Sequence, residues 1–197
     1  MEVILASASP RRKELLKEIV ESFEILPAQG EENCSEKSPK KLVKALSKQK
    51  AEEIFALENS KGKIVLGADT VVVLGKKVLG KPKDEQDAFK MLKSLSGRAH
   101  YVYTGVCFLY EIGGKKRVIN TLAKTRVYFY KLSDEQINAY VASGSPMDKA
   151  GGYGIQDGGL VRKIQGSFSN VVGLPVELCK KIYKKIEKET GNDQTCD

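Results

Sequence analysis

The sequence predicts an α/β fold in which buried strands alternate with amphipathic helices. The apolar run over residues 64–74 is typical of a central strand that is covered on both faces. Serine–proline pairs precede helical periodicity at Pro10 and at Pro39, and such pairs mark helix starts. Two long strand-like segments, 99–111 and 116–131, follow in the second half of the chain.

The composition is that of an ordinary globular protein. Of 197 residues, 41% are hydrophobic and 29% are charged, and this length allows one large domain or two small ones. No apolar run approaches the ~20 residues of a membrane span, and the first five residues are too short for a signal peptide. We therefore expect a cytoplasmic protein without a membrane contact.

The charge is basic, with a net value of +8 and a pI of about 9.2. Such a balance permits binding of nucleic acid or of free polyphosphates. Most of the positive charges are lysines spread along the whole chain, whereas a stripe of arginines and aromatic residues would be stronger evidence for nucleic acid. We therefore do not expect a nucleic-acid partner.

The few cysteines and the single histidine argue against two kinds of site. The four cysteines are scattered without a CxxC pair, and only His100 could serve a zinc ion or a Ser-His-Asp triad. Cys107 lies in a strand-like run and Cys179 on the apolar side of the last helix, so both are expected in the core. Cys196 lies in a polar tail, and His100 is expected to be structural.

The first element predicts a strand over residues 3–5, a turn over Ser7–Ser9 and a helix from Pro10. Arg11 and Arg12 lie in the first helical turn, where the helix dipole favours acidic side chains instead. Free backbone N–H groups and two guanidinium groups there suit an anion such as a phosphate. The alternative is a capped helix with two solvated arginines.

The next segments are a short alternating strand over residues 23–27, a polar loop with Glu31 and Glu32, and a long helix that Ser38 and Pro39 begin. The apolar positions of this helix recur at helical spacing: Val43, Leu46, Ile54 and Leu57.

Lys50 lies in the middle of this apolar stripe, four residues from both Leu46 and Ile54. An inward lysine is costly unless its ammonium group meets an anion, either a ligand or a buried carboxylate. The alternative is that its stem runs along the apolar surface and its ammonium group reaches solvent.

Asp69 and Thr70 interrupt the apolar run of the central strand. A carboxylate there should be paired, hydrogen-bonded or bound to a metal. A hairpin turn over 75–77 leads into residues 78–79, and Lys81 follows the strand end, where sites of α/β proteins usually lie. The phosphate-binding pattern GxxxxGK[ST] is absent from the sequence.

The second half begins with a helix after Asp84, followed by the two long strands, and Ser133 with Gln136 forms a capping box for the next helix. We expect short strands over 160–164 and 170–172, and a last helix near Pro175 followed by a polar tail over 191–197.

Between these elements, residues 145–159 form a glycine-rich loop that can approach a ligand closely. It carries Asp148, Lys149 and Gln156. The alternative is a plain surface connection, although the segment is long for one.

These polar residues together suit phosphoryl chemistry. Arg12, Lys50 and Lys81 can neutralise a polyphosphate, and Glu32 and Asp69 can hold Mg²⁺ or orient a water. The chain has no obvious nucleophile–histidine pair, so a metal-assisted attack by water fits better.

Several motifs in one order carry a resemblance to a known family: LASASPRRKELL, GADTVVV, GKP, MLKSLSG, YTGV, MDKAGGYGIQ and NVVGLP. The chain resembles the Maf family of nucleoside triphosphate pyrophosphatases from about residue 3 to residue 178. The resemblance implies one catalytic domain over residues 1–190, with a mixed twisted sheet, flanking helices and two lobes around a cleft, as in inosine triphosphate pyrophosphatases.

The resemblance also implies hydrolysis of a nucleoside triphosphate between its α and β phosphates, with Mg²⁺ or Mn²⁺ assisting. Two arginines after the proline and Thr70 after the aspartate resemble the branch that acts on dTTP and UTP. The branch that acts on 7-methyl-GTP resembles SPWR and has glutamine after the aspartate. A homodimer is a further expectation of the family.

The resemblance gives each matching residue a role. Asp69 matches the proton acceptor, backbone groups near Ser7 and Ser9 would touch phosphate, and Gly152 stands where alanine is usual. The residues that match the phosphate and metal constellation of the family are Arg12, Glu32, Lys50 and Lys81. The residues that match its positions of base selection are Arg11, Thr70 and Gln156.

Whether Asp69 acts as a base or as a metal ligand stays open at this point. A carboxylate bound to Mg²⁺ among lysines would have a lowered pKa and would be a poor base near neutral pH. We favour a mixed role in which Asp69 orients water.

Two other functions are considered. One is a nucleic-acid-binding regulator of cell division, which rests on the pI and on an association of the family with septum formation. The other is a pyrophosphatase that acts on 7-methyl-GTP or another modified nucleotide.

Overall fold

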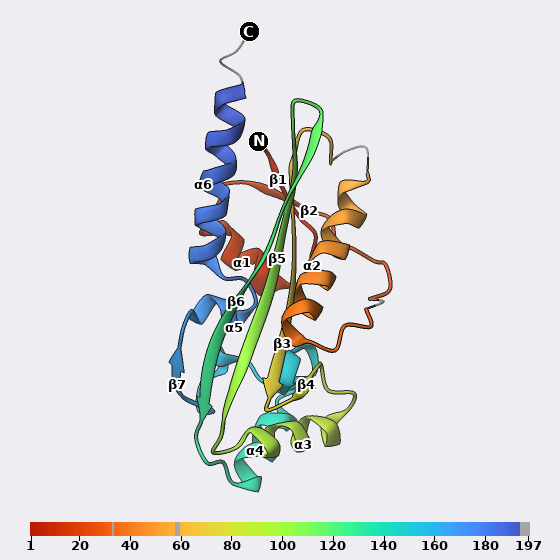
Figure 1. The fold of residues 1–197 in the computed structure, drawn as a ribbon. Helices are drawn as coiled ribbons and strands as arrows, with labels where there is room; N and C mark the ends of the chain where they lie inside the picture. The colour runs from red at the N-terminus through yellow and green to blue at the C-terminus, as the bar shows by residue number, and fades with distance from the viewer. Residues whose placement is uncertain (33, 58–59, 194–197) are drawn as a thin grey trace. The chain divides into compact units, whose positions relative to one another are not determined.

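The computed structural model describes residues 1–32, 34–57 and 60–193. Figure 1 labels its helices and strands. The chain divides into two compact units. Unit 1 comprises Met1–Asp69, Thr104–Ala123 and Gly173–Asp197, and unit 2 comprises Thr70–Tyr103 and Lys124–Val172.

The strands form a mixed sheet in the hydrogen-bonded order β2-β1-β3-β5-β6-β7, with β4 paired to β3. Strand β1 is parallel to β2 and to β3, whereas β3–β4 and β6–β7 are antiparallel. The strand bounds are as follows: β1 Val3–Leu5, β2 Phe23–Ile25, β3 Ile64–Leu74, β4 Lys77–Leu79, β5 Ala99–Ile112, β6 Lys115–Phe129 and β7 Val161–Gln165. The predicted α/β class with flanking helices is confirmed.

Six helices accompany the strands in the described residues, and three short 3₁₀ turns lie within 145–157. The helices are α1 Pro10–Lys17, α2 Pro39–Phe55, α3 Glu85–Leu95, α4 Asp134–Ala142, α5 Phe168–Val172 and α6 Val176–Asp193. None of the described helices is long and apolar enough to cross a bilayer. Helix α6 continues into the segment that was expected to be a tail, and residues 194–197, with Cys196, lie outside the described residues.

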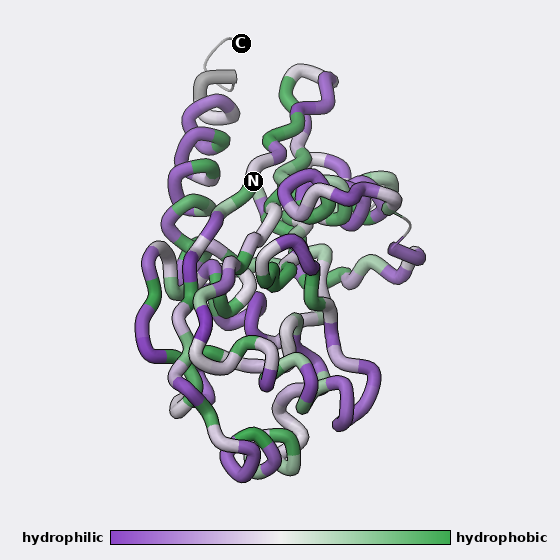
Figure 2. Tube along the Cα trace, turned by 60° about the horizontal axis from the view of Figure 1, so that its bottom comes forward, coloured by the Kyte–Doolittle hydropathy of each residue, from purple (hydrophilic) through white to green (hydrophobic). Residues whose placement is uncertain are grey.

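The core of unit 1 follows from the two-residue period of its strands. Leu5 and Leu66 pack with Leu16 of α1 and Ile186 of α6, while neighbouring strand residues such as Val65 pack against α2. Because successive strand side chains point to opposite faces, both faces are covered. Figure 2 shows the amphipathic pattern of α6, where hydrophobic and hydrophilic residues alternate.

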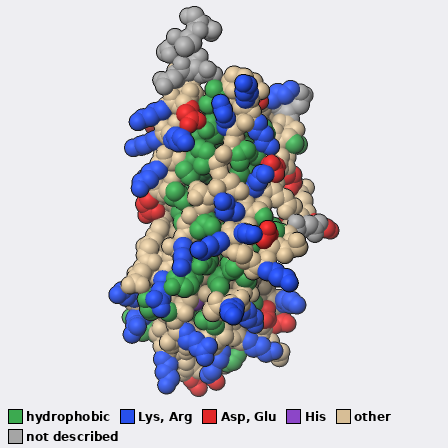
Figure 3. Space-filling view, in the orientation of Figure 1, with side chains coloured by type: hydrophobic (Ala, Val, Ile, Leu, Met, Phe, Trp, Pro, Cys, Tyr) green, Lys and Arg blue, Asp and Glu red, His purple; other side chains and the backbone are tan. Residues whose placement is uncertain are grey.

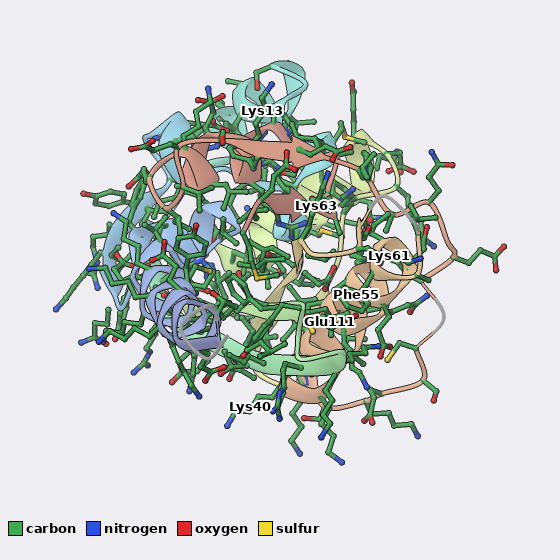
Figure 4. The ribbon with its side chains drawn as sticks, turned by 90° about the horizontal axis from the view of Figure 1, so that it is seen from above. Lys13, Lys40, Phe55, Lys61, Lys63 and Glu111 are labelled. Atoms are coloured by element: carbon green, nitrogen blue, oxygen red, sulfur yellow. The ribbon has the colours of Figure 1, made fainter. Side chains whose placement is uncertain are left out.

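The expected core cysteines, Cys107 and Cys179, are both buried. Lys63, labelled in Figure 4, directly precedes β3 and pairs with two carboxylates. Its ammonium nitrogen lies 2.9 Å from Glu24 Oε2 and 3.1 Å from Glu2 Oε2. These two hydrogen bonds raise the pKa of Lys63.

Unit 2 has a separate core. Val72 of β3, Val102 of β5 and Val127 of β6 pack with Leu92 of α3 and Ile137 of α4. The capping box predicted at Ser133 and Gln136 is present, and Asp84 caps α3 by accepting the N–H of Asp87 at 2.7 Å.

The strand predicted over 170–172 is wrong, because these residues lie in α5. The two valines favour a strand locally, but the hydroxyl of Ser167 accepts the backbone N–H of Asn170 at 3.1 Å, as a helix cap does. The Asn170 amide then donates to Val102 O and to Thr125 Oγ1. Tertiary contacts therefore override the local propensity.

Two details of α2 also differ from expectation. Leu57 was assigned to the inward stripe but is 46% exposed, because the helix ends at Phe55. Ser38 stands at the cap position but makes no side-chain cap hydrogen bond.

Candidate active site

Hydrogen bonds fix the side chain of Arg12 at the start of α1. Ser9 caps the helix, with its hydroxyl 3.5 Å from the backbone nitrogen of Arg12. The Arg12 guanidinium donates from Nη1 to Ser7 Oγ at 3.0 Å and from Nε to Gly173 O at 3.0 Å. Arg12 is therefore fixed at the positive end of the helix, where an anion is favoured, rather than extended into solvent.

Ser7 links the turn to this arginine, because its buried hydroxyl also accepts the backbone N–H of Ser9 at 3.3 Å. The predicted turn and cap are thus present. Arg11 lies beside Arg12 in the first turn of α1, which contains no acidic residue.

Lys50 joins two carboxylates. Its ammonium nitrogen lies 2.7 Å from Asp69 Oδ1 and 2.8 Å from Glu32 Oε1, and only 18% of the lysine side chain is exposed. Of the alternatives for this inward lysine, the structure selects the buried carboxylate.

A close approach of helix and strand makes this pair possible. A Cβ atom placed on Gly67 would lie 2.2 Å from Ser47 O and 2.8 Å from Ala51 N. Glycine in β3 therefore lets α2 lie directly on the strand, and the adjacent turn of α2 carries Lys50 to Asp69. The signal in the sequence for this close approach is a glycine inside a strong strand pattern.

The electrostatics of Asp69 are governed first by burial. The residue is 7% exposed, and burial raises its pKa, while Lys50 and then Arg12 lower it, leaving the pKa raised. The lowered pKa that we expected was for a carboxylate that also binds Mg²⁺; within the protein alone, loss of hydration outweighs the nearby cations. Burial likewise lowers the pKa of the Arg12 guanidinium, which Asp69 partly offsets.

Unit 1 thus gathers seven of the predicted site residues: Ser7, Ser9, Arg11, Arg12, Glu32, Lys50 and Asp69. Unit 2 carries the other five: Thr70, Lys81, Asp148, Lys149 and Gln156.

Within unit 2, the segment before Lys81 is tied to the glycine-rich loop. The backbone N–H of Gly151 donates to Gly80 O at 2.8 Å, and Gly151 has a φ of 73° that favours glycine. Lys149 pairs with Asp148 at 2.9 Å, and Gln156 lies exposed in the 3₁₀ turn Ile155–Asp157.

The donor set suits a divalent cation only as a partial site. In the described part of the chain, no group of three or more His, Cys, Asp or Glu side chains gathers, so Glu32 and Asp69 supply two carboxylates and no more. Mg²⁺ is usually held by one or two carboxylates together with water and substrate phosphates, and the pair fits that pattern.

Comparisons with known proteins identify the relatives of this chain. The family model described as "Maf-like protein" matches residues 2–186. A dTTP/UTP pyrophosphatase of Thermosipho africanus is 52% identical, with 89% of this chain and 88% of the relative covered. The same name is given to a relative from Carboxydothermus hydrogenoformans, which is 48% identical with 95% and 98% covered.

Among solved structures, the Staphylococcus aureus Ham1 protein has a similar fold, with a TM-score of 0.53 and 14% identity. The match covers 94% of this chain and all of that one. With a family match over almost the whole sequence and relatives at about half identity, the chain belongs to the Maf-like protein family.

Proposed function

We propose that this protein is a nucleoside triphosphate pyrophosphatase that hydrolyses dTTP and UTP to the monophosphate and pyrophosphate. The observation that carries the proposal is the buried Lys50–Asp69 pair, electrostatically coupled to Arg12, in a chain whose relatives are named dTTP/UTP pyrophosphatases. Phosphoryl transfer needs positioning and charge neutralisation rather than a covalent residue, and these side chains supply both.

In the proposed reaction, water adds across the anhydride bond between the α and β phosphates. That bond breaks, pyrophosphate leaves, and Asp69 accepts or orients the proton that the water releases. Arg12, at the α1 N-terminus, and Lys50 are proposed to interact with the negative oxygens of the phosphates. The same role is proposed for Lys81 on the family resemblance alone.

Glu32 and Asp69 would hold the divalent cation, Mg²⁺ or Mn²⁺. When bound, the cation supplies further neutralisation of phosphate charge. Arg11, Thr70 and Gln156 are proposed to select the base, and Asp148 and Lys149 of the glycine-rich loop are proposed to contribute to substrate binding. The single catalytic domain, the cytoplasmic location and the homodimer stay predictions.

The test is a substrate panel. Purified protein is incubated with dTTP, UTP, CTP, GTP and 7-methyl-GTP, each with Mg²⁺ or Mn²⁺, and pyrophosphate is measured. Release from dTTP and UTP above the others is expected. Preferred release of pyrophosphate from 7-methyl-GTP would favour the family branch that acts on that nucleotide. No release of pyrophosphate from any nucleotide would contradict the proposal.

Nucleic-acid binding is kept as the alternative function, and a steep salt dependence of DNA binding would support it. Figure 3 shows Lys and Arg side chains spread over the whole visible face rather than gathered in one patch.

A further inference from the structure

The glycine-rich loop of unit 2 is closed by one carboxylate oxygen. Asp157 Oδ2 accepts the hydroxyl of Tyr140 at 2.5 Å and the hydroxyl of Ser145 at 2.6 Å. Tyr140 lies in α4, Ser145 begins the loop, and Asp157 is near its end. We call these three residues the loop clasp. It joins the two ends of the loop to each other and to the preceding helix.

The backbone of the loop reinforces the clasp. The Tyr140 hydroxyl accepts the N–H of Gly154 at 2.9 Å, and the N–H of Asp157 donates to Gly154 O at 3.2 Å. Burial, helped by the hydrogen bond to Asp157, raises the pKa of Tyr140 to about 12. Its hydroxyl therefore keeps its proton, and donates it, throughout the neutral range.

Lys149 completes the arrangement from the other side. Its ammonium group donates to Ser145 O at 2.6 Å and to Ser145 Oγ at 3.0 Å, and its side chain is only 12% exposed. A Cβ atom on Gly154 would lie 2.7 Å from Asp157 Oδ2 and 2.9 Å from Lys149 Cε. A side chain at position 154 would therefore force Asp157 or Lys149 to shift out of the clasp.

Gln156 directly precedes Asp157 of the loop clasp in the chain. It stands between Ile155 and Asp157 in one 3₁₀ turn, and it is exposed. Because the turn has only three residues, the fixed Asp157 side chain restrains the backbone that carries Gln156.

We propose that Asp157, held by Tyr140 and Ser145, is a positioning residue that presents Gln156 to the nucleotide base. The inference rests on the proposed function, because Gln156 owes its role in base selection to that proposal. It extends the set of specificity-determining residues to a carboxylate that does not itself touch the substrate.

The test is a double-mutant cycle on the preference for UTP over GTP, measured as the ratio of kcat/KM. Asp157→Ala is expected to reduce this ratio about tenfold, mainly through a higher KM for UTP, since a misplaced binding group weakens recognition. Gln156→Ala should reduce the UTP-over-GTP ratio by a similar factor. The double variant should have no lower a ratio than Gln156→Ala alone, because the effects of residues that act through each other are not additive.

Two further variants separate positioning from a general loss of structure. Asp157→Asn keeps an acceptor oxygen for Tyr140 and Ser145 and should recover most of the preference. Tyr110→Phe removes a comparable tyrosine–carboxylate hydrogen bond, 2.7 Å long to Glu189 in unit 1, and should leave the preference unchanged. Amide hydrogen exchange over residues 145–159 should accelerate in Asp157→Ala but not in Tyr110→Phe.

The outcomes are distinguishable from a failure of the proposed function. A wild-type protein without activity on dTTP and UTP contradicts that function, while exchange in Asp157→Ala still tests the clasp. Unchanged exchange at the loop, an unchanged UTP preference, or strictly additive losses in the double variant would each overturn the positioning role.

Discussion

The Lys50 ammonium group lies 2.7 Å from Asp69 Oδ1, and both side chains are mostly buried. Each ion has lost much of its hydration, so each depends on the other far more than an exposed pair would. A second carboxylate, Glu32, lies 2.8 Å from the same nitrogen at the more exposed side. The pair is therefore a polar anchor within the core and also the centre of the proposed site.

Lys50→Met should be strongly destabilising. The substitution leaves the Asp69 carboxylate without its nearest cation, which costs about 3–5 kcal/mol for a buried pair. Chemical denaturation at pH 7.5 measures this cost. Lys48→Met is the matched control, because Lys48 lies 3.6 Å from Glu52 in an exposed pair whose loss costs only about 0.5 kcal/mol. Equal losses for the two variants would contradict the anchor.

Asp69→Asn should lower kcat for dTTP and UTP by about 100-fold or more, because it removes a preorganised charge at the site. Asparagine has nearly the same shape, so KM should change little. Asp134→Asn serves as the control, since Asp134 is exposed at the start of α4 and pairs with Lys93. Full activity of Asp69→Asn would exclude a role of this carboxylate in the reaction.

Gly67→Ala should destabilise unit 1, because the new Cβ atom would meet Ser47 O and force α2 away from β3. Overpacking of this kind costs about 1–3 kcal/mol or more, and the shift should also weaken the Lys50–Asp69 contact. The midpoint temperature of thermal unfolding and kcat should therefore both decrease. Gly80→Ala is the control, because nothing lies within 4 Å of its added Cβ atom.

Much of the fold was predictable because most helices and strands are encoded by patterns in the neighbouring residues of the sequence. The apolar run gave β3 its observed bounds, and the cap-plus-proline signal placed the start of α1 and α2. Asn170 shows where local reasoning ends. Its helix depends on hydrogen bonds to Val102 and Thr125, which are far away in the sequence.

Parts of the geometry of the candidate site were predictable in the same way. Helical spacing placed Lys50 on the inward face, and a carboxylate in an apolar strand singled out Asp69. Residues that act through a backbone carbonyl or a long-range hydroxyl, such as Gly173 beside Arg12 and Tyr140 beside Asp157, carry no such local pattern. Sequence alone therefore finds the charges of the site but not the groups that hold them.

We expect the stability of the unit 2 core to decrease in acid because of His100. The imidazole is 1% exposed, its Nε2 lies 2.7 Å from the Tyr153 hydroxyl, and its ring makes edge contacts with Phe129 and Tyr153. Burial lowers the pKa of His100 to about 4 from its ordinary value of 6.5. The expected structural role of this histidine fits these contacts.

The sign of the pH effect follows from which state binds the proton. Between pH 6.5 and about 4, the unfolded chain protonates this histidine and the folded protein does not, so stability falls as the pH falls. The free energy of unfolding falls by about 3 kcal/mol in total through this group as the pH reaches about 4, and it falls no further through this group at lower pH. Denaturation curves of the wild type and of His100→Phe, recorded from pH 7.5 to 4, measure it. The free energy of unfolding of the wild type should fall relative to that of His100→Phe across that window, because only the wild type carries this group. Parallel pH dependence in both proteins would show that His100 is not the group responsible.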